Sequence, residues 1–376
     1  MRTSWLWLGV TILLITASEA GAQPPSPLDI ARLYAFPGAS SGPASAVSVG
    51  RGLSDRWLGE EPFDNPAALP ERGLTVSPVL LRMERQDLPA DYRNYDESAG
   101  FLDVAGGCLS LPVRGIGIAL YAYEPVLRRE DAAFTSKPDE VPVGTFTSAS
   151  SARELRAGLA LSHAWRAARF GAALEWTRRD DSYDFKETSG NPFAGERHVD
   201  FSGDGFGFQA GARVEVVPRV TLGGALRYVP ALDLSGEQDS HALGIAGPAS
   251  ATREAGWEGG LSARVAVTEA FRVLASVGGR TAQVWDGFDA TSGRAASWGA
   301  GFDYEEPEQP WTFRMGLGQE QQDGVPEPRA GVIGLGLGWK LDDLRLDVGA
   351  LRRSIVRVDK ATSFDDRVVA SATVGF

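Results

Sequence analysis

The chain has 376 residues, including 45 glycines, 10 tryptophans and one cysteine, and carries a formal net charge of −12. This acidic charge argues against a nucleic-acid partner, because phosphate binding depends on clustered Lys and Arg. Mean hydropathy is −0.14, and after the first 22 positions no apolar run approaches the length of about 20 residues that a membrane-spanning helix needs. A barrel in lipid remains compatible with that average, because every second side chain faces a polar interior.

The first 22 residues have the organisation of a secretory signal peptide. Arg2 is the charged end, Trp5 to Ile15 is the apolar stretch, and Ala20-Gly21-Ala22 fits a small-residue cleavage site. The sequence therefore predicts an exported chain that is cleaved near Ala22. A signal anchor is the alternative, but the apolar stretch is short for a membrane span.

A lead segment at residues 23–70 precedes the strand-like part of the chain. Residues 23–45 are rich in Pro, Ser, Ala and Gly, a composition typical of extended chain and not of a helical domain.

From about residue 71 to the end, apolar side chains alternate with small or polar ones. Leu155 to Trp165 places Leu, Ala, His and Trp on odd positions and Arg, Gly, Ser and Ala on even ones, and the next segment repeats the pattern. Segments of about 10 such residues, broken by turn residues, are typical of outer-membrane barrels. The expected strands are 73–86, 99–112, 114–128, 155–165, 169–177, 206–216, 220–228, 257–267, 271–280, 297–304, 311–317, 333–339, 344–348 and 367–376.

The connections between these strands alternate in length. Short ones are expected near Val113, Ala167, Pro218, Glu269, Glu308 and Asp342, and long ones at 87–98, 129–150, 184–202 and 233–251. Short periplasmic turns and long external loops produce this asymmetry. We therefore predict an all-β, transmembrane antiparallel β-barrel of about 14 strands at 71–376, with residues 23–70 as an N-terminal hatch in the lumen.

Aromatic residues gather at the ends of the expected strands, as in interfacial girdles. They are Trp165, Trp176, Tyr228, Trp257, Trp285, Tyr304, Trp311 and Trp339. A β-propeller or a large soluble sandwich would also show repeated short strands, but would not explain this placement. The terminal Phe376 closes an alternating strand, which suggests recognition by the barrel assembly machinery.

A short motif lies just before the first expected strand. Ser45 to Gly52 is a small-residue and Gly segment, and Asn65-Pro66-Ala67 follows it. This arrangement resembles the N-terminal signature of FadL-type outer-membrane transporters. The resemblance implies a monomeric barrel of fourteen strands whose N-terminal hatch blocks the lumen, and uptake of long-chain fatty acids or other hydrophobic compounds that leave sideways through a gap in the wall. Asn65-Pro66 can also be a turn that starts the first strand, and this reading is compatible with the functional one.

Charged residues occupy the inward positions of many expected strands. They are Arg156, Glu175, Arg213, Glu215, Arg227, Glu258, Arg264, Arg272, Arg280, Asp303, Arg314, Arg345 and Asp347. Because a charge in lipid is costly, these side chains must line water or pair across strands. A polar network that supports the barrel and holds the hatch is the first interpretation, and a selectivity ring for an anionic solute is the second.

The sequence offers no catalytic, metal or cofactor site. His163, His198 and His241 are far apart and have no clustered Cys or acid partner. Ser162 and His163 are adjacent in a strand and point to opposite faces, and we expect His163 to lie at the membrane interface near a turn. Cys108 is alone, so it has no intramolecular disulfide partner and is expected to be a small buried or lipid-facing residue.

The predicted function is passive uptake of hydrophobic or amphipathic small molecules across the bacterial outer membrane, gated by displacement of the hatch around Asn65, Pro66 and Ala67. The expected surroundings are outer-membrane lipids and lipopolysaccharide, and the expected state is a monomer. A general diffusion porin is one alternative. A structural or secretion-accessory barrel that transports nothing is the other.

Overall fold

The structure is a computed structural model, and it describes residues 50–54, 57–58, 61–68, 73–86, 95–96, 103–136, 144–187, 196–240, 245–286, 290–292, 294–322, 329–356 and 362–375. The predicted signal peptide at 1–22, the first part of the predicted hatch and Phe376 lie outside the described residues. Among the described residues no helix is long and apolar enough to cross a membrane.

The described strands form one antiparallel sheet that closes on itself, because β1 pairs with β19 as well as with β3. The strand segments are β1 Gly73–Gln86, β2 Tyr95–Asp96, β3 Asp103–Val113, β4 Ile116–Ser136, β5 Gly144–Trp165, β6 Ala168–Glu187, β7 Glu196–Val217, β8 Val220–Val229, β9 Leu232–Ser240, β10 Ile245–Arg253, β11 Gly256–Ala266, β12 Phe271–Arg280, β13 Gln283–Asp286, β14 Ala290–Ser292, β15 Ala295–Glu305, β16 Trp311–Gln322, β17 Arg329–Leu341, β18 Leu344–Val356 and β19 Thr362–Val374. Some segments follow one another along the same strand of the barrel, and we call each complete barrel strand a stave. Five consecutive pairs (β2/β3, β8/β9, β10/β11, β12/β13 and β14/β15) each make one stave, so these 19 segments form 14 staves. The predicted barrel of fourteen strands is confirmed.

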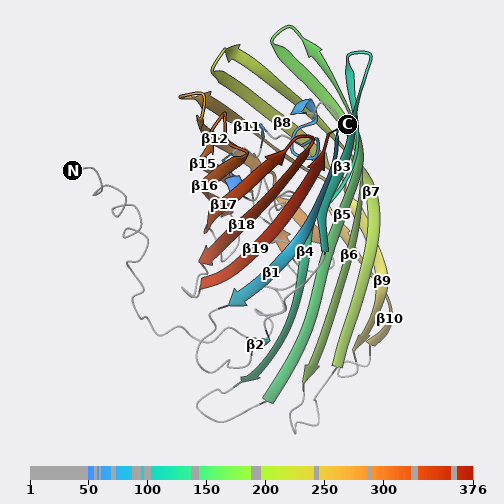
Figure 1. Cartoon of the computed structure of the whole chain (residues 1–376). Helices are drawn as coiled ribbons and strands as arrows, with labels where there is room; N and C mark the ends of the chain where they lie inside the picture. The colour runs from blue at the N-terminus through green and yellow to red at the C-terminus, as the bar shows by residue number, and fades with distance from the viewer. Residues whose placement is uncertain are drawn as a thin grey trace, which may run out of the picture.

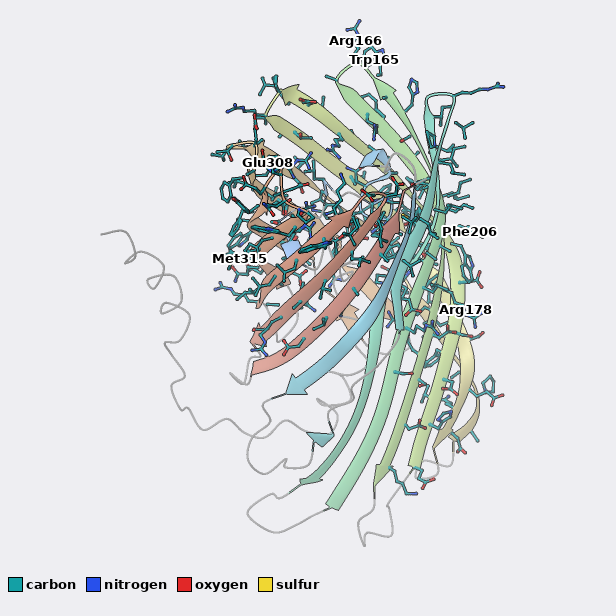
Figure 2. All side chains as sticks on the ribbon, in the orientation of Figure 1. Trp165, Arg166, Arg178, Phe206, Glu308 and Met315 are labelled. Atoms are coloured by element: carbon teal, nitrogen blue, oxygen red, sulfur yellow. The ribbon has the colours of Figure 1, made fainter. Side chains whose placement is uncertain are left out.

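The outer face of the barrel is apolar. Each stave carries at least one exposed large apolar side chain, and along β17 exposed and buried residues alternate through Ile333, Leu335 and Leu337. Such side chains cannot face water over a whole circumference, so they face hydrocarbon and the barrel is transmembrane. Phe206 projects from this face, and Arg178 lies farther along the outer wall toward the end with the long strands (Figure 2).

Tight turns join strands at one end of the barrel. Arg114, Arg166 and Asp342 each have a positive φ at the start of a two-residue connection, the conformation that tight hairpins require. His163 and Trp165 are exposed near these turns, and the His163 Nδ1 lies 3.3 Å from the Gly115 carbonyl oxygen. Short turns mark the periplasmic end of bacterial barrels, so we use them to define that end.

Three of the predicted long loops are largely strand. The segments 129–150, 184–202 and 233–251 are mostly covered by the extended ends of β4 to β7 and by β9 and β10. β5 has 22 residues and is therefore about 70 Å long, well above the apolar band of about 25 Å. The predicted loops at these positions were wrong, because strands that leave the membrane lose the apolar alternation on their outer face. Figure 1 shows β4 to β7 running far past the ends of β17 to β19.

Candidate functional site

The described part of the predicted hatch, residues 50–54, 57–58 and 61–68, runs along the inner wall of the barrel, and we call it the plug segment. It meets the wall at inward-facing glycines of successive staves. In order along the plug segment these glycines are Gly336 (β17), Gly316 (β16), Gly299 and Gly301 (β15), Gly278 (β12), Gly260 (β11), Gly223 (β8), Gly211 (β7) and Gly171 (β6).

At most of these glycines the approach leaves no room for a Cβ atom. A Cβ built on Gly316 would lie 1.8 Å from the carbonyl oxygen of Arg51, and one built on Gly171 would lie 2.3 Å from the carbonyl carbon of Pro66. Glycine is the residue that allows such close contact between two backbones. The glycines of the wall therefore form a track that fits the plug segment, which we call the glycine track.

The Asn65-Pro66-Ala67 motif joins the plug segment to the wall. Asn65 is fully buried, and its Nδ2 donates to the carbonyl oxygens of Trp57 at 2.7 Å, Gly224 at 3.2 Å and Ala212 at 3.3 Å. Its Oδ1 accepts from the Ala67 backbone N–H at 2.9 Å, at the start of the 3-10 turn Pro66–Ala68. An Asn before a Pro suits such a start, because its side chain satisfies a free N–H while proline presets φ.

A buried ion pair holds the other end of the plug segment. The Arg51 Nε donates to Asp303 Oδ1 at 2.9 Å, and both side chains are at most 3% exposed. Next to Asp303 in the β15/β16 ladder lies Arg314, whose Nη1 donates to Asp347 Oδ1 at 2.7 Å. Breaking such a pair by removing one partner is strongly destabilising, which makes this a fixed attachment.

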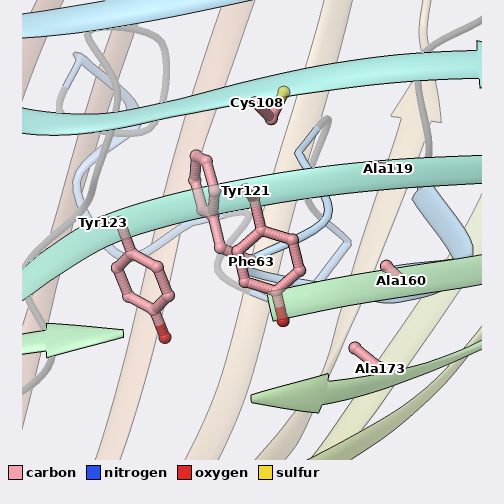
Figure 3. Close-up of a cluster of buried hydrophobic side chains, with 7 residues drawn as sticks. All are labelled: Phe63, Cys108, Ala119, Tyr121, Tyr123, Ala160 and Ala173. Carbon is pink, nitrogen blue, oxygen red and sulfur yellow. The ribbon is translucent and has the colours of Figure 1, made fainter. Parts of the chain in front are cut away.

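Phe63 of the plug segment packs against two tyrosines of β4 (Figure 3). Its ring centroid lies 6.2 Å from that of Tyr121 and 5.2 Å from that of Tyr123. The three rings are at most 4% exposed, and the Tyr121 hydroxyl donates to Glu175 Oε1 at 2.8 Å. This aromatic layer closes the space between the plug segment and β4.

On the long-strand side of the aromatic layer lies a cluster of buried ion pairs, which we call the charge cluster. It contains Arg156, Arg179, Arg227 and Arg253 with Glu154, Glu175, Asp181 and Glu258. Within it, Glu258 Oε1 accepts from Arg156 at 3.1 Å and from Arg227 at 2.6 Å, so it joins β5, β8 and β11. Arg227 also donates to the Phe63 carbonyl oxygen, which ties the charge cluster to the plug segment.

A second apolar cluster lies beyond the charge cluster, toward the long-strand end. It consists of Val199, Phe201, Leu232, Leu234 and Ala251, with Ala249 packed against it. It adjoins the charge cluster directly, because Leu232 is the ladder partner of Arg253.

The predicted polar residues occupy three kinds of position. Arg156, Glu175, Arg227, Arg314 and Asp347 are buried in the ion pairs described above. Glu258 and Asp303 are buried in such pairs as well. Five lie toward the periplasmic end: Arg345 pairs with Asp347 at 2.9 Å, Arg272 pairs with Glu305 at 2.7 Å, Arg213 and Arg264 are half-buried, and Glu215 is exposed beside the β7/β8 turn. Arg280 is half-buried at the other end of β12, opposite Glu258 in the ladder.

Four members of the charge cluster were missed by the sequence analysis: Glu154, Arg179, Asp181 and Arg253. All four lie just outside the strands predicted from apolar alternation. Their positions could have identified them, because residues two or four apart in a strand point to the same face. Glu154 thus shares the inward face of Arg156, and Arg179 shares that of Glu175.

The wall is irregular directly beside the aromatic layer. In the ladder between β4 and β5, Tyr123 pairs with Arg156 and Val126 with Glu154, so Glu124 and Pro125 form a bulge opposite Leu155. On the other side of β4, the described pairs with β3 end at Gly106 and Tyr123. Pro125 has no N–H to donate to a ladder, which suits its place in this bulge.

These features define a transmembrane β-barrel with an internal plug. Solved structures share this fold, among them the following three. A FadL homologue from Pseudomonas aeruginosa has a TM-score of 0.68 and 16% identity over 90% of this chain and 100% of its own. The toluene transporter TbuX of Ralstonia pickettii has 0.61 and 14% over 88% and 98%, and the toluene transporter TodX of Pseudomonas putida has 0.58 and 15% over 90% and 98%. No protein-family model matches the sequence, and no curated protein matches it significantly.

At these identities the likeness concerns the fold. The fold that the Asn-Pro-Ala resemblance implied is confirmed, including placement of the described part of the N-terminal segment inside the barrel.

Proposed function

We propose that this chain is an outer-membrane channel for the passive uptake of hydrophobic small molecules. The observation that carries the proposal is the position of the β4 bulge at Glu124 and Pro125, next to Tyr123 of the aromatic layer. Below that level the plug segment lies along the glycine track. A solute that moves through the bore toward the periplasm meets the plug segment at the level of the bulge at Glu124 and Pro125. A sideways path through the wall into the membrane is then shorter than a path past the plug segment.

The path also has a suitable start for an apolar solute. The cluster of Val199, Phe201, Leu232, Leu234 and Ala251 lies on the inner side near the long-strand end. The structures with the same fold include two toluene transporters, which supports a hydrophobic cargo. Long-chain fatty acids remain one candidate within this class.

In this proposal the N-terminal segment closes the direct route to the periplasm. Asn65, Pro66 and Ala67 are the point where it is fixed to β6, β7 and β8. Removing residues 23–62 should raise ion conductance in planar bilayers, whereas a general diffusion porin would hardly change.

The test of sideways transport is deletion of Pro125, which makes the β4/β5 ladder regular. Uptake of radiolabelled toluene by cells carrying the variant should fall to the level of cells without the barrel, while the chain still reaches the outer membrane. A deletion of Ser148, in the part of β5 above the membrane, serves as the control for loss of one strand residue. Undiminished uptake after deletion of Pro125 would remove the sideways path, and no uptake by the unmodified chain would favour a barrel that does not transport.

A further inference from the structure

The charge cluster limits the kind of solute that this bore accepts. The following inference rests on the proposed function and deepens it, since it concerns the charge of the solute. Four arginines and four acids make up the charge cluster, and every one takes part in an ion pair within it.

The arginines are shared between acids and do not depend on a solute for a partner. Arg156 contacts Glu154 at 2.8 Å and Glu258 at 3.1 Å, and Arg227 contacts Glu175 at 2.9 Å and Glu258 at 2.6 Å. Their side chains are at most 7% exposed. An incoming carboxylate would therefore have to displace a glutamate that already holds its place.

Other described residues also place charges of both signs inside the barrel, among them the pair of Arg353 and Glu320 at 2.6 Å. Arg280 shares its face of β12 with the buried Leu274 and Ser276, and Glu61 of the plug segment is 7% exposed. These described residues therefore add charges of both signs and no group of one sign alone. A solute ion of either sign would thus leave water without gaining a surplus charge of opposite sign, which is unfavourable in a buried site.

We infer that this barrel selects uncharged hydrophobic molecules and discriminates against anionic and cationic amphiphiles of the same size. The selection follows from the neutral charge cluster between the outer apolar cluster and the β4 bulge. Fatty acids in their ionised form would therefore be poor solutes, and neutral hydrocarbons, alcohols or esters good ones.

Three probes with one alkyl chain test the inference: 1-dodecanol, dodecanoate and dodecylammonium, each measured by equilibrium binding to the purified, folded, full-length barrel. Dodecanol should bind at least about tenfold more tightly than either ion, equivalent to 1.4 kcal/mol. Equal or tighter binding of an ion, or no binding of any probe, would overturn the inference. Uptake by cells is measured separately and tests the channel function alone.

Two variants, one that removes a negative charge and one that removes a positive charge, distinguish charge selection from a general disruption of the barrel. Glu258→Gln should shift preference toward dodecanoate, and Arg253→Gln should shift it toward dodecylammonium. Glu237→Gln, an equal charge change at an exposed position of β9, should leave the ratio as in the wild type. A shift in the same direction in both lumen variants would contradict charge selection. If Glu258→Gln does not fold, the wild-type ratio and Arg253→Gln still decide the matter.

Discussion

Replacing Gly316 by alanine should loosen the plug segment without altering the outside of the barrel. The new methyl carbon would lie 1.8 Å from the Arg51 carbonyl oxygen, and ordinary contact begins at 3.4 Å. The backbone of Arg51 must therefore retreat by about 1.6 Å. That movement pulls its side chain from Asp303, which it now contacts at 2.9 Å in a fully buried pair.

The expected cost is that of breaking a buried ion pair, about 3–5 kcal/mol, unless the plug segment leaves the wall and water reaches both charges. In either case ion conductance through the barrel in planar bilayers should rise and the midpoint of thermal unfolding in detergent should fall. Circular dichroism follows the unfolding, and single-channel recording follows the conductance.

The wall offers matched controls for this substitution. Gly331→Ala places the same methyl group on β17 with no atom within 4 Å, so it should leave both measurements unchanged. Gly336→Ala, whose Cβ would lie 3.0 Å from the Gly50 Cα, should have an intermediate effect. If Gly316→Ala behaves like Gly331→Ala, the plug segment does not press on β16 and the reasoning is refuted.

Three further outcomes are expected. Asn65→Ala should lower the free energy of unfolding in urea by roughly 3 kcal/mol, because it leaves buried backbone carbonyls without their donor; a loss below 1 kcal/mol would contradict an anchoring role. Asp303→Asn should cost about 3–5 kcal/mol, whereas Asp366→Asn, which removes a largely exposed pair, should cost less than about 1 kcal/mol; equal losses would argue against the buried attachment. Hydrogen bonds to two aspartates raise the pKa of His198 above its ordinary value of 6.5. Protonated His198 therefore stabilises the folded chain, and this contribution is complete below pH 6.5 and is lost as pH rises through the raised pKa. A histidine NMR titration, with His198→Gln to assign the signal, would contradict this if the pKa were 6.5 or lower.

Most of the barrel architecture could be predicted from the alternation of apolar and polar residues in the sequence. The alternation along Leu155 to Trp165 follows from the period of two in a strand and from the contrast between lipid and a polar interior. The short connections near Ala167 and Asp342 then separated one alternating segment from the next, and counting the segments gave the number of strands. The Asn-Pro-Ala motif located the attachment of the plug segment, because Asn and Pro have specific backbone uses.

The extensions beyond the membrane could not be predicted in the same way. In Arg178 to Lys186 polar side chains lie on the outer face as well, since that face meets water instead of lipid. The period-two signal in hydrophobicity therefore disappears while the strand continues. For the same reason Arg179 and Glu154 were missed.

Sequence alone thus determined which side chains of the membrane-spanning strands face lipid and how the hairpins follow one another, because each of these depends on residues close together in the chain. Only the tertiary structure decided which charges pair, as with Glu154 and Arg253, and which glycines receive the plug segment, as with Gly316 and Arg51. Those contacts join staves far apart in the chain, and their partners are set by the closure and stagger of the barrel, which no local pattern encodes.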